Sequence, residues 1–342
     1  MKINYFVDGS PSLASCVRAF LRYLLTSGSK ARSITLLCSL IMAFTLSAQQ
    51  YCLTEPFGYG RNATGGTGGT VVTVNSFEAL ANSLGDYDKT SDGKYRVNGD
   101  SEKRIVVITK SITFPYLLNI TDCSNKTILA LPGVVLSNPT KETQGSGIMY
   151  FLGGSNIILR NITFKGPGAE DLNGYDPLCF DGVTNAWVDH CDFSDGIDGN
   201  FDNKGDTDNI TVSWCRFSYS SASTEHAFTN LVGSSSDDKP SDDRYNITWA
   251  YCWWDQGCVE RMTRCRNADL HFLNCYWNSS VAKCYIGPEN AKCYLDGCTM
   301  EGSISTQNRF KSYGGTNGLK SVGSVGVPSN TGSVSAPTYA YT

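Results

Sequence analysis

Six segments in the middle of the chain share one nine-residue pattern, and this repeat restricts the fold more than any other feature. The second, fourth, seventh and ninth residues of every copy are apolar or Cys. Successive copies start 29, 24, 37, 23 and 23 residues apart. Each copy therefore predicts two short strands joined by a bend at its fifth and sixth residues. The copies begin at Asn156, Asn185, Asn209, Asn246, Asp269 and Lys292.

A period of 23 to 24 residues with short strands is typical of a parallel β-helix, an all-β solenoid. Its turns stack about 4.8 Å apart, so equivalent side chains form columns inside the cylinder. The additional residues in the spacings of 29 and 37 must leave the cylinder as loops. The repeats lack the Asn-Gly hairpin turns of an antiparallel sandwich and the Leu pattern of leucine-rich repeats.

The chain contains 14 cysteines, and their positions favour packing over cross-linking. The sequence contains no Cys-x-x-Cys pair, so it gives no indication of a zinc site. Five cysteines occupy the seventh position of successive repeats, where small thiols can form a buried column. Because neighbouring turns lie within the Cα separation of a disulfide, oxidation of adjacent pairs remains an alternative. The five are Cys191, Cys215, Cys252, Cys275 and Cys298.

Residues 1–48 have the composition of a leader and signal peptide. Lys30 and Arg32 precede the apolar run 34–46, and small residues place the cleavage site after Ala48. The run is shorter than a membrane-spanning helix, so an anchor is the less favoured alternative. We therefore expect a secreted protein, extracellular or periplasmic, without a membrane partner.

The remainder of the chain divides into a β-helix catalytic domain, 49–302, and a Gly/Ser-rich tail, 303–342, that packs on the helix. Asn75 or Ser76 can cap a short helix that covers the N-terminal end of the cylinder. The formal charge of −4 includes +4 from residues 1–48, which leaves −8 for the mature chain. This negative charge argues against a nucleic-acid partner, because proteins that bind nucleic acids carry clusters of basic residues. We expect a monomer.

Three carboxylates precede successive repeats, at the edge where loops of a β-helix form a groove. They are Asp176, Asp198 and Asp202. Hard oxygen ligands from neighbouring turns suit Ca²⁺ better than zinc or copper. The alternative is that they are solvated turn residues near several glycines.

Three arginines lie at the corresponding edge, before the repeat at Asp269. They are Arg261, Arg264 and Arg266. On an acidic protein this cluster suggests an anionic target, because the guanidinium group pairs with carboxylates through two hydrogen bonds. Surface ion pairs with Asp255, Glu260 or Asp269 are an equally acceptable interpretation.

Five ordered motifs make the chain resemble the pectate lyase family of polysaccharide lyases, of the pectate lyase C type. The resemblance implies a secreted, right-handed parallel β-helix whose loops form a groove. It further implies Ca²⁺-dependent β-elimination of α-1,4-linked polygalacturonate, an acidic polysaccharide, to 4,5-unsaturated oligogalacturonides. The motifs are 58–69, 187–190, 198–214, 231–235 and 261–266.

Position by position, the resemblance implies that Asp176, Asp198 and Asp202 hold Ca²⁺. Arg261 matches the arginine taken as the catalytic base, and Arg266 the arginine that holds a substrate carboxylate. Arginine is ordinarily always protonated, so the base role comes from the resemblance alone. Electrostatics equally allow Arg261 to stabilise developing charge.

The chain departs from the family at three positions. Phe228 stands where the family has its substrate-binding lysine, and a nearby insertion brings in His226. Gly174 replaces a further carboxylate, for which Asp171 is a candidate substitute. Thr263 replaces a proline. We expect His226 and Arg264 to join Arg266 in substrate binding.

Three other functions remain as alternatives. A polygalacturonase-type hydrolase also uses a β-helix, but it needs an acid and a base flanking a water molecule. A non-catalytic pectin-binding β-helix would keep the internal columns and could lose Arg261. A pectin lyase acts on methyl-esterified substrate and would be expected to lack the three carboxylates.

Overall fold

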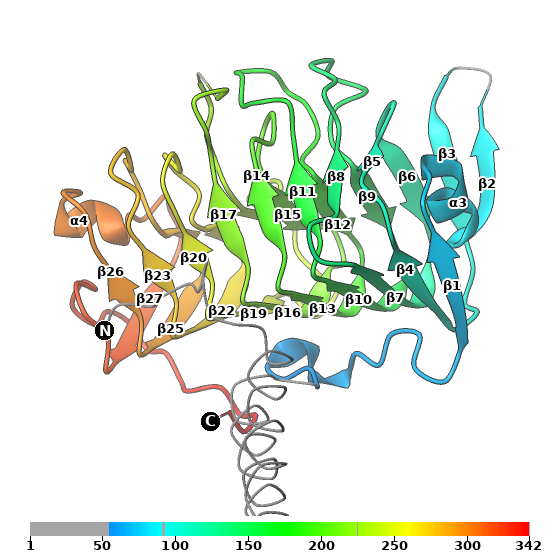
Figure 1. Cartoon of the computed structure of the whole chain (residues 1–342). Helices are drawn as coiled ribbons and strands as arrows, with labels where there is room; N and C mark the ends of the chain where they lie inside the picture. Colours follow the sequence, from blue (N-terminus) through cyan, green and yellow to red (C-terminus); the bar gives the residue numbers. More distant parts are fainter. Residues whose placement is uncertain (1–54, 91–92, 224, 342) are drawn as a thin grey trace, which may run out of the picture. The chain divides into compact units, whose positions relative to one another are not determined.

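The chain winds into a solenoid whose sides are three long sheets in the computed structural model, which describes residues 55–90, 93–223 and 225–341 (Figure 1). Neighbouring strands within a sheet are three strands apart in the chain, because each turn contributes one strand to each sheet; the exceptions are β2–β3 and β25–β27 at the ends of the solenoid. All neighbours are parallel except the pair β2–β3. This is the parallel β-solenoid that the repeat predicts, and the fold class is confirmed.

The first strand of each repeat belongs to the longest sheet, called sheet A here. Its strands are β1 (Thr70–Val74), β4 (Arg104–Ile108), β7 (Ser124–Ala130), β10 (Ser155–Arg160), β13 (Thr184–Asp189), β16 (Asp208–Ser213), β19 (Tyr245–Ala250), β22 (Ala268–Leu273), β25 (Lys292–Asp296) and β27 (Gly318–Val322).

The second strand of each repeat belongs to sheet C. Its strands are β5 (Ile112–Thr113), β8 (Val135–Ser137), β11 (Thr163–Lys165), β14 (Asp192–Ser194), β17 (Arg216–Ser218), β20 (Trp253–Trp254), β23 (Tyr276–Trp277) and β26 (Thr299–Met300).

Sheet B lies between the repeats in sequence. Its strands are β2 (Gly85–Lys89), β3 (Tyr95–Gly99), β6 (Leu118–Thr121), β9 (Met149–Leu152), β12 (Leu178–Asp181), β15 (Phe201–Lys204), β18 (Leu231–Val232), β21 (Arg264–Arg266) and β24 (Gly287–Glu289).

The observed register agrees with the alignment of the repeats. In sheet A the second residues pair in sequence, from Ile157 with Ala186 to Leu270 with Cys293. In sheet C the ninth residues form a buried column that is aromatic except for Met300 at its end, and the rings of Phe164 and Phe193 stack at 4.9 Å. Burial of these columns removes large apolar surfaces from water and stabilises the cylinder.

The bend between sheets A and C has a backbone cause. The sixth residue of every repeat has a positive φ, between 51° and 62°, which is the left-handed conformation that turns the chain sharply. Only the last of the six is glycine, and Asn is the commonest of the others because it tolerates this conformation. These residues are Asn161, His190, Trp214, Tyr251, Asn274 and Gly297.

The predicted cysteine column lies just after this bend. Its five thiols are free and buried, as are all eleven cysteines in the described part of the chain. Each Sγ of the column points to a carbonyl of the preceding turn, for example Cys252 to Val212 at 3.4 Å and Cys275 to Trp249 at 3.3 Å. The column therefore acts as packing, and the disulfide alternative does not hold for these residues.

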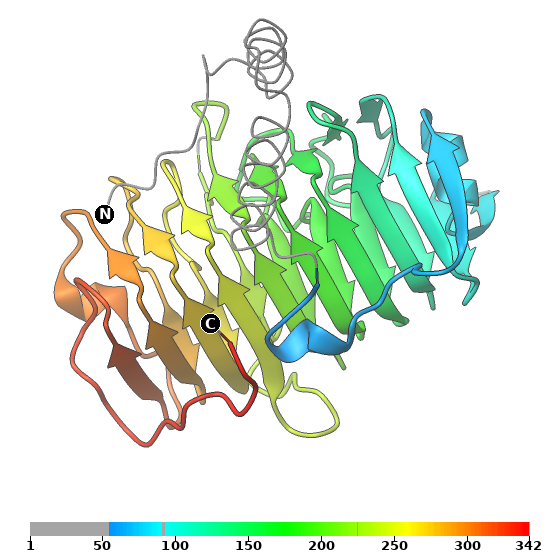
Figure 2. The same ribbon diagram turned by 60° about the horizontal axis from the view of Figure 1, so that its bottom comes forward.

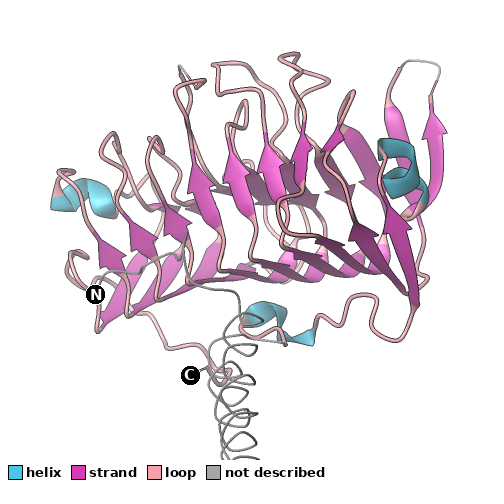
Figure 3. Cartoon of the chain, viewed as in Figure 1, coloured by secondary structure: helices cyan, strands magenta, loops and turns pink. Residues whose placement is uncertain are grey.

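The N-terminal end of the cylinder is covered by α3 (Phe77–Asn82) (Figure 3). The hydroxyl of Ser76 accepts a hydrogen bond from the amide of Ala79 at 3.2 Å, and Phe77 and Leu80 enter the core. The predicted cap is thus present. The leader and its cleavage site lie outside the described residues. No helix of the described chain is long and apolar enough to span a membrane.

Both ends of the described chain lie along the outer face of sheet A (Figure 2). Near the start, η1 (Tyr59–Asn62) binds sheet A through the amide of Gly60, which donates to Thr211 at 2.9 Å. Near the end, the hydroxyl of Tyr339 lies 2.6 Å from both Thr248 Oγ1 and His271 Nδ1. The C-terminal segment also contains α4 (Thr306–Arg309) and adds β27 to sheet A. These segments leave sheet B exposed for function.

Candidate active site

The outer face of sheet B carries the polar side chains of the candidate site in two rows. In β15, Phe201 and Asn203 point into the core, so Asp202 and Lys204 point outward. Asn203 pairs with Val232 on the next strand, so Asp202 lies beside Leu231, and Leu231 in turn pairs with Arg264. Asp202 and Arg264 thus share one row across the sheet. Lys204 and Arg266, each two residues later, continue the parallel row.

Loops that enter sheet B supply the rest of the site. The long loops 166–177 and 219–230 follow sheet C and lead into β12 and β18. Loop 166–177 accounts for the additional residues of the 29-residue spacing, whereas those of the 37-residue spacing are divided between loop 219–230 and the loop 233–244 that follows β18. Asp176 and His226 lie near the ends of the first two of these loops, and Asp198 and Arg261 precede β15 and β21 in the same way. Residues far apart in sequence therefore meet at one edge of the sheet.

A cavity of about 530 Å³ lies where these loops meet the sheet. It brings together five of the seven predicted site residues: Asp176, Asp198, Asp202, His226 and Arg261. Arg264 instead lines a smaller cavity of about 150 Å³, and Arg261 lines both. Arg266 lines neither. The predicted arginine cluster is thus divided between two environments.

Asp176 is the most buried of the three carboxylates, with 5% of its surface exposed. Its Oδ2 atom has no hydrogen-bond partner. Burial raises the pKa of Asp176 well above its ordinary value, and the negative charges of Asp202 and Asp198 raise it further. Gly199 makes room for this side chain, because a β-carbon there would lie 2.8 Å from Asp176 Oδ1.

Asp202 has a similar environment. Burial raises its pKa, whereas a hydrogen bond with Asp176 and the positive charge of Arg261 oppose the rise. One carboxylate oxygen, Oδ1, accepts a hydrogen bond from the amide of Leu231 at 2.8 Å. Two carboxyl groups buried side by side repel each other when both are ionised. A cation placed between them would remove that repulsion.

The donor set fits a hard cation in its chemistry. Three carboxylates face one cavity, and the free oxygen of buried Asp176 lacks a partner. Within the described ranges, however, no three acidic, His or Cys side chains already stand at the spacing of a metal centre. Asp198 instead contacts His226, whose Nε2 lies 2.7 Å from its Oδ1. Ca²⁺ suits these oxygen ligands and would draw them together.

Arg261 differs from its neighbours because no carboxylate or hydrogen-bond acceptor in the described chain pairs with its guanidinium group. Its Cζ atom lies 4.7 Å from the centre of the Phe228 ring. Its backbone φ of 57° is uncommon for a side chain of this size. Such conformations concentrate at functional sites. A full positive charge is therefore available to a ligand in either cavity.

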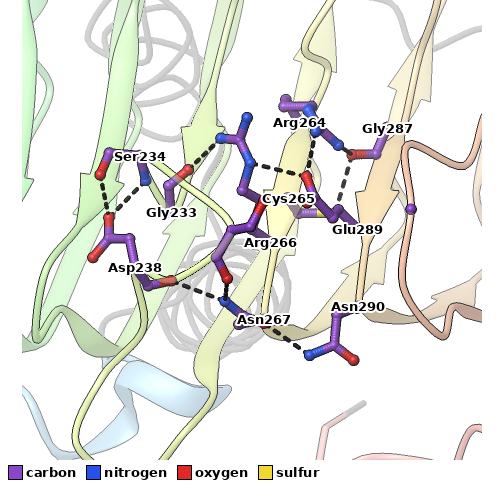
Figure 4. A network of polar contacts seen from close by, with 12 residues as sticks. Gly233, Ser234, Asp238, Arg264, Cys265, Arg266, Asn267, Gly287, Glu289 and Asn290 are labelled. Atoms are coloured by element: carbon purple, nitrogen blue, oxygen red, sulfur yellow. Dashed lines mark hydrogen bonds and ion pairs between the residues drawn. The ribbon is translucent and has the colours of Figure 1, made fainter.

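Arg264 and Arg266 are both paired with Glu289 (Figure 4). Glu289 Oε2 accepts from Arg264 Nη2 at 2.5 Å and from Arg266 Nε at 3.0 Å. Arg266 Nη1 also donates to the carbonyl of Gly233 at 2.6 Å. The hydrogen bond from Ser236 lowers the pKa of Glu289 most, and the two arginines lower it further. Both arginines are thus ion-paired, but with Glu289 and not with Asp255, Glu260 or Asp269 as the sequence suggested. Their remaining N–H groups can still bind an anion.

The structure places two further histidines away from the cavity. His190 lies at a bend, 2.7 Å from Asp189, with its ring stacked on Trp214. His271 is buried under Tyr339, and burial lowers its pKa to about 4. The contacts of both histidines are those of residues that stabilise the fold.

Lys204 was not singled out by the sequence analysis. It lines the larger cavity, and the only other basic residues that line it are His226 and Arg261. Burial acts to lower its pKa, but Cys179 and the carboxylates of Asp181 and Asp202 outweigh burial and raise it. The available signal was strand alternation, because Lys204 follows Asp202 by two residues and must share its face. Asp171, the candidate substitute for Gly174, also lines this cavity, with its Oδ1 3.3 Å from His226 Nδ1.

Comparison with known proteins gives one consistent result. A family model described as pectate lyase matches residues 33–341. A pectate trisaccharide-lyase of Thermotoga maritima is 28% identical over 268 residues, which are 74% of this chain and 65% of that protein. A pectin lyase of Pectobacterium carotovorum is 32% identical, covering 66% of this chain and 68% of that protein.

The solved structures that match have the same fold. One of them is pectate lyase C from Erwinia chrysanthemi, solved with Ca²⁺. Its TM-score is 0.60 at 17% identity, and the match covers 84% of this chain and 92% of that one. The chain spans just under two thirds of the length of the Thermotoga relative.

Proposed function

Because the chain belongs to the pectate lyase family, we propose that it cleaves α-1,4-linked polygalacturonate by Ca²⁺-dependent β-elimination. The products would be 4,5-unsaturated oligogalacturonides. The names of its relatives support the substrate class, and a structural neighbour solved with Ca²⁺ supports the cofactor. Secretion, suggested by residues 1–48, is part of the same proposal, since a polysaccharide of this size is met outside the cytoplasm.

One observation carries the proposal most directly. The unpaired guanidinium group of Arg261 borders the same cavity as three carboxylates, two of them with pKa values raised by burial. A polyanionic substrate cannot approach those carboxylates closely without a cation. The site therefore needs both a metal and an arginine, which is the combination that elimination from a uronate requires.

In the reaction, the C5–H bond of a galacturonate unit breaks and its electron pair forms the C4=C5 double bond. The C4–O bond breaks at the same time, and the released oxygen takes up a proton as the new chain end. Bound Ca²⁺, held by Asp176, Asp198 and Asp202, would neutralise the uronate carboxylate and so make the C5 proton more acidic. Arg261 acts at C5. It first releases one proton to solvent, then takes up the C5 proton, and the guanidinium cation so formed stabilises the developing charge.

The other basic residues bind and orient the polymer. Arg264 and Arg266 keep N–H groups that Glu289 does not occupy and can pair with carboxylates of neighbouring units. His226 and Lys204 border the cavity and can contact the unit next to the metal. Arg264 and Arg266 lie on β21 and are held by Glu289, so they limit the orientations in which the polymer can cross Arg261.

A second candidate substrate is methyl-esterified pectin. The pectin lyase relative, at 32% identity, favours it. The three carboxylates speak against it, because a neutral ester does not require a metal bridge. Activity on highly esterified pectin compared with polygalacturonate separates the two.

The deciding experiment measures ultraviolet absorbance of the conjugated double bond during incubation with polygalacturonate. Product should form with Ca²⁺ and stop when EDTA is added, and renewed Ca²⁺ should restore it. Activity that survives EDTA would contradict the lyase proposal and favour a hydrolase. Binding of the polymer without any product would favour a non-catalytic role.

A further inference from the structure

Arg261 must be held in place by something other than an ion pair. An arginine side chain has several rotatable bonds, and an unrestrained guanidinium group would occupy many positions in a cavity of this size. In the described chain no carboxylate pairs with it. The contact that remains is the ring of Phe228, 4.7 Å from Cζ.

The ring of Phe228 is itself fixed on two sides. Its other neighbour is the imidazole of His226, with ring centres 3.9 Å apart. The carbonyl of Phe228 accepts a hydrogen bond from the hydroxyl of Tyr219, and its amide donates to the carbonyl of His226 at 2.7 Å. The side chains of His226, Phe228 and Arg261 therefore lie in a row at the border between the two cavities, with the two rings tilted by 45°.

Backbone pairing brings Phe228 and Arg261 to the same place. Phe228 forms a parallel β-bridge with Glu260. Two residues later, the amide of Asn230 donates to the carbonyl of Arg261 at 2.7 Å. The contact between ring and guanidinium group thus follows from adjacent turns of the solenoid rather than from a chance rotamer.

A ring holds a guanidinium group differently from a carboxylate. Glu289 orders Arg264 and Arg266 but cancels much of their charge. The face of Phe228 attracts the cation through its quadrupole and leaves the net charge intact. An arginine that acts on a negatively charged uronate must keep its charge, so an aromatic ring suits it better than a carboxylate.

We propose that Phe228, backed by His226, is the positioning residue for Arg261. It holds the guanidinium group at the border of the two cavities without neutralising it. This inference rests on the proposed lyase function, in which Arg261 acts at C5. Loss of the ring leaves the charge of Arg261 unchanged but allows the group to move, so the effect falls on turnover more than on substrate binding.

The test compares Phe228→Leu and Phe228→Tyr in otherwise wild-type protein and in an Arg261→Lys background. Phe228→Leu should lower kcat about ten-fold with little change in KM. A ten-fold change in rate corresponds to the free energy of an ordinary cation–π contact. Phe228→Tyr should keep turnover close to that of wild type, because the aromatic ring of Tyr offers the guanidinium group the same π face. In the Arg261→Lys background, Phe228→Leu should cost less than about two-fold, since the group that it positions is gone.

The matched control is Trp253→Leu. It removes the ring that Arg216 overlies at 5.7 Å on sheet C and should leave kcat unchanged. Full turnover in Phe228→Leu would overturn the inference, as would an equal loss in both backgrounds or an effect confined to KM. Equal melting temperatures of wild type and Phe228→Leu exclude a folding defect as the cause of lost turnover.

A spectroscopic measurement separates this inference from the proposed function. The Nε–H proton of Arg261, assigned through Arg261→Lys, should show an upfield ring-current shift by NMR that Phe228→Leu removes. This readout needs no turnover. If wild type yields no unsaturated product, the proposed function fails, and the presence or absence of the shift still decides whether Phe228 positions Arg261.

Discussion

Nε2 of His226 lies 2.7 Å from Oδ1 of Asp198, one of the three carboxylates proposed to hold Ca²⁺. A cation bound by Asp198 must compete with this contact. His226→Ala should therefore raise the affinity for Ca²⁺ by about two- to five-fold, the usual strength of one partly exposed polar contact. Isothermal titration calorimetry with Ca²⁺ measures the change.

The control for this variant is His190→Ala, which removes a histidine at the same distance from Asp189 on sheet A. It should leave Ca²⁺ affinity unchanged. Equal or weaker affinity in His226→Ala would show that the contact does not compete with the metal.

Arg261→Ala should lower kcat by about 10²- to 10³-fold, the cost of losing one donor directed at developing charge. Its melting temperature should stay close to that of wild type, because the guanidinium group makes no ion pair in the described chain. Turnover is measured by absorbance of the unsaturated product, and folding by circular dichroism. Retained turnover would remove Arg261 from the mechanism.

Glu289→Ala should destabilise the protein by about 1–3 kcal/mol, because it leaves two largely buried arginines without their shared acceptor. Chemical denaturation measures the free energy of unfolding. Asp243→Asn, which removes an exposed ion pair with Lys239, should have no measurable effect. An equal, negligible effect of both changes would mean that the pairs in Figure 4 contribute little.

His271 should make folding stability depend on pH in the acid range. Burial lowers its pKa in the folded protein to about 4 from an ordinary 6.5, so the unfolded chain binds more protons between these values. Stability should fall as pH decreases from 6.5 to 4, by an amount of about 3 kcal/mol at most. In His271→Gln this component should be absent. Thermal melts of both proteins across the range measure it, and identical pH profiles would contradict the prediction.

The buried cysteines should be inert in the native state. All eleven described cysteines are free and buried, so reagents in solution do not reach them. Burial raises the pKa of the Cys258 thiol to about 12, whereas contacts with Cys215 and Cys275 outweigh burial and lower that of Cys252. Ellman's reagent should therefore find at least eleven more reactive thiols after unfolding in guanidinium chloride than before. Dithiothreitol should leave the melting temperature unchanged. A lower melting temperature in dithiothreitol would indicate a disulfide.

The repeat predicted the fold because a solenoid is built from local, periodic contacts. Each copy needs only the preceding copy to bury its apolar residues, so the alignment of Ile157 with Ala186, or of Phe164 with Phe193, is also their pairing in space. The same reasoning gave the column of thiols and the capping helix after Ser76. The resemblance to pectate lyases rested on ordered motifs and is confirmed by the family model.

The sequence by itself thus determined the cylinder, its columns, the family, and a set of acidic and basic residues at one edge. Only the tertiary structure decided how these residues are paired. It placed Glu289 between Arg264 and Arg266 and the ring of Phe228 under Arg261. These contacts join turns separated by loops of irregular length, and periodicity carries no information about side chains that meet outside the cylinder.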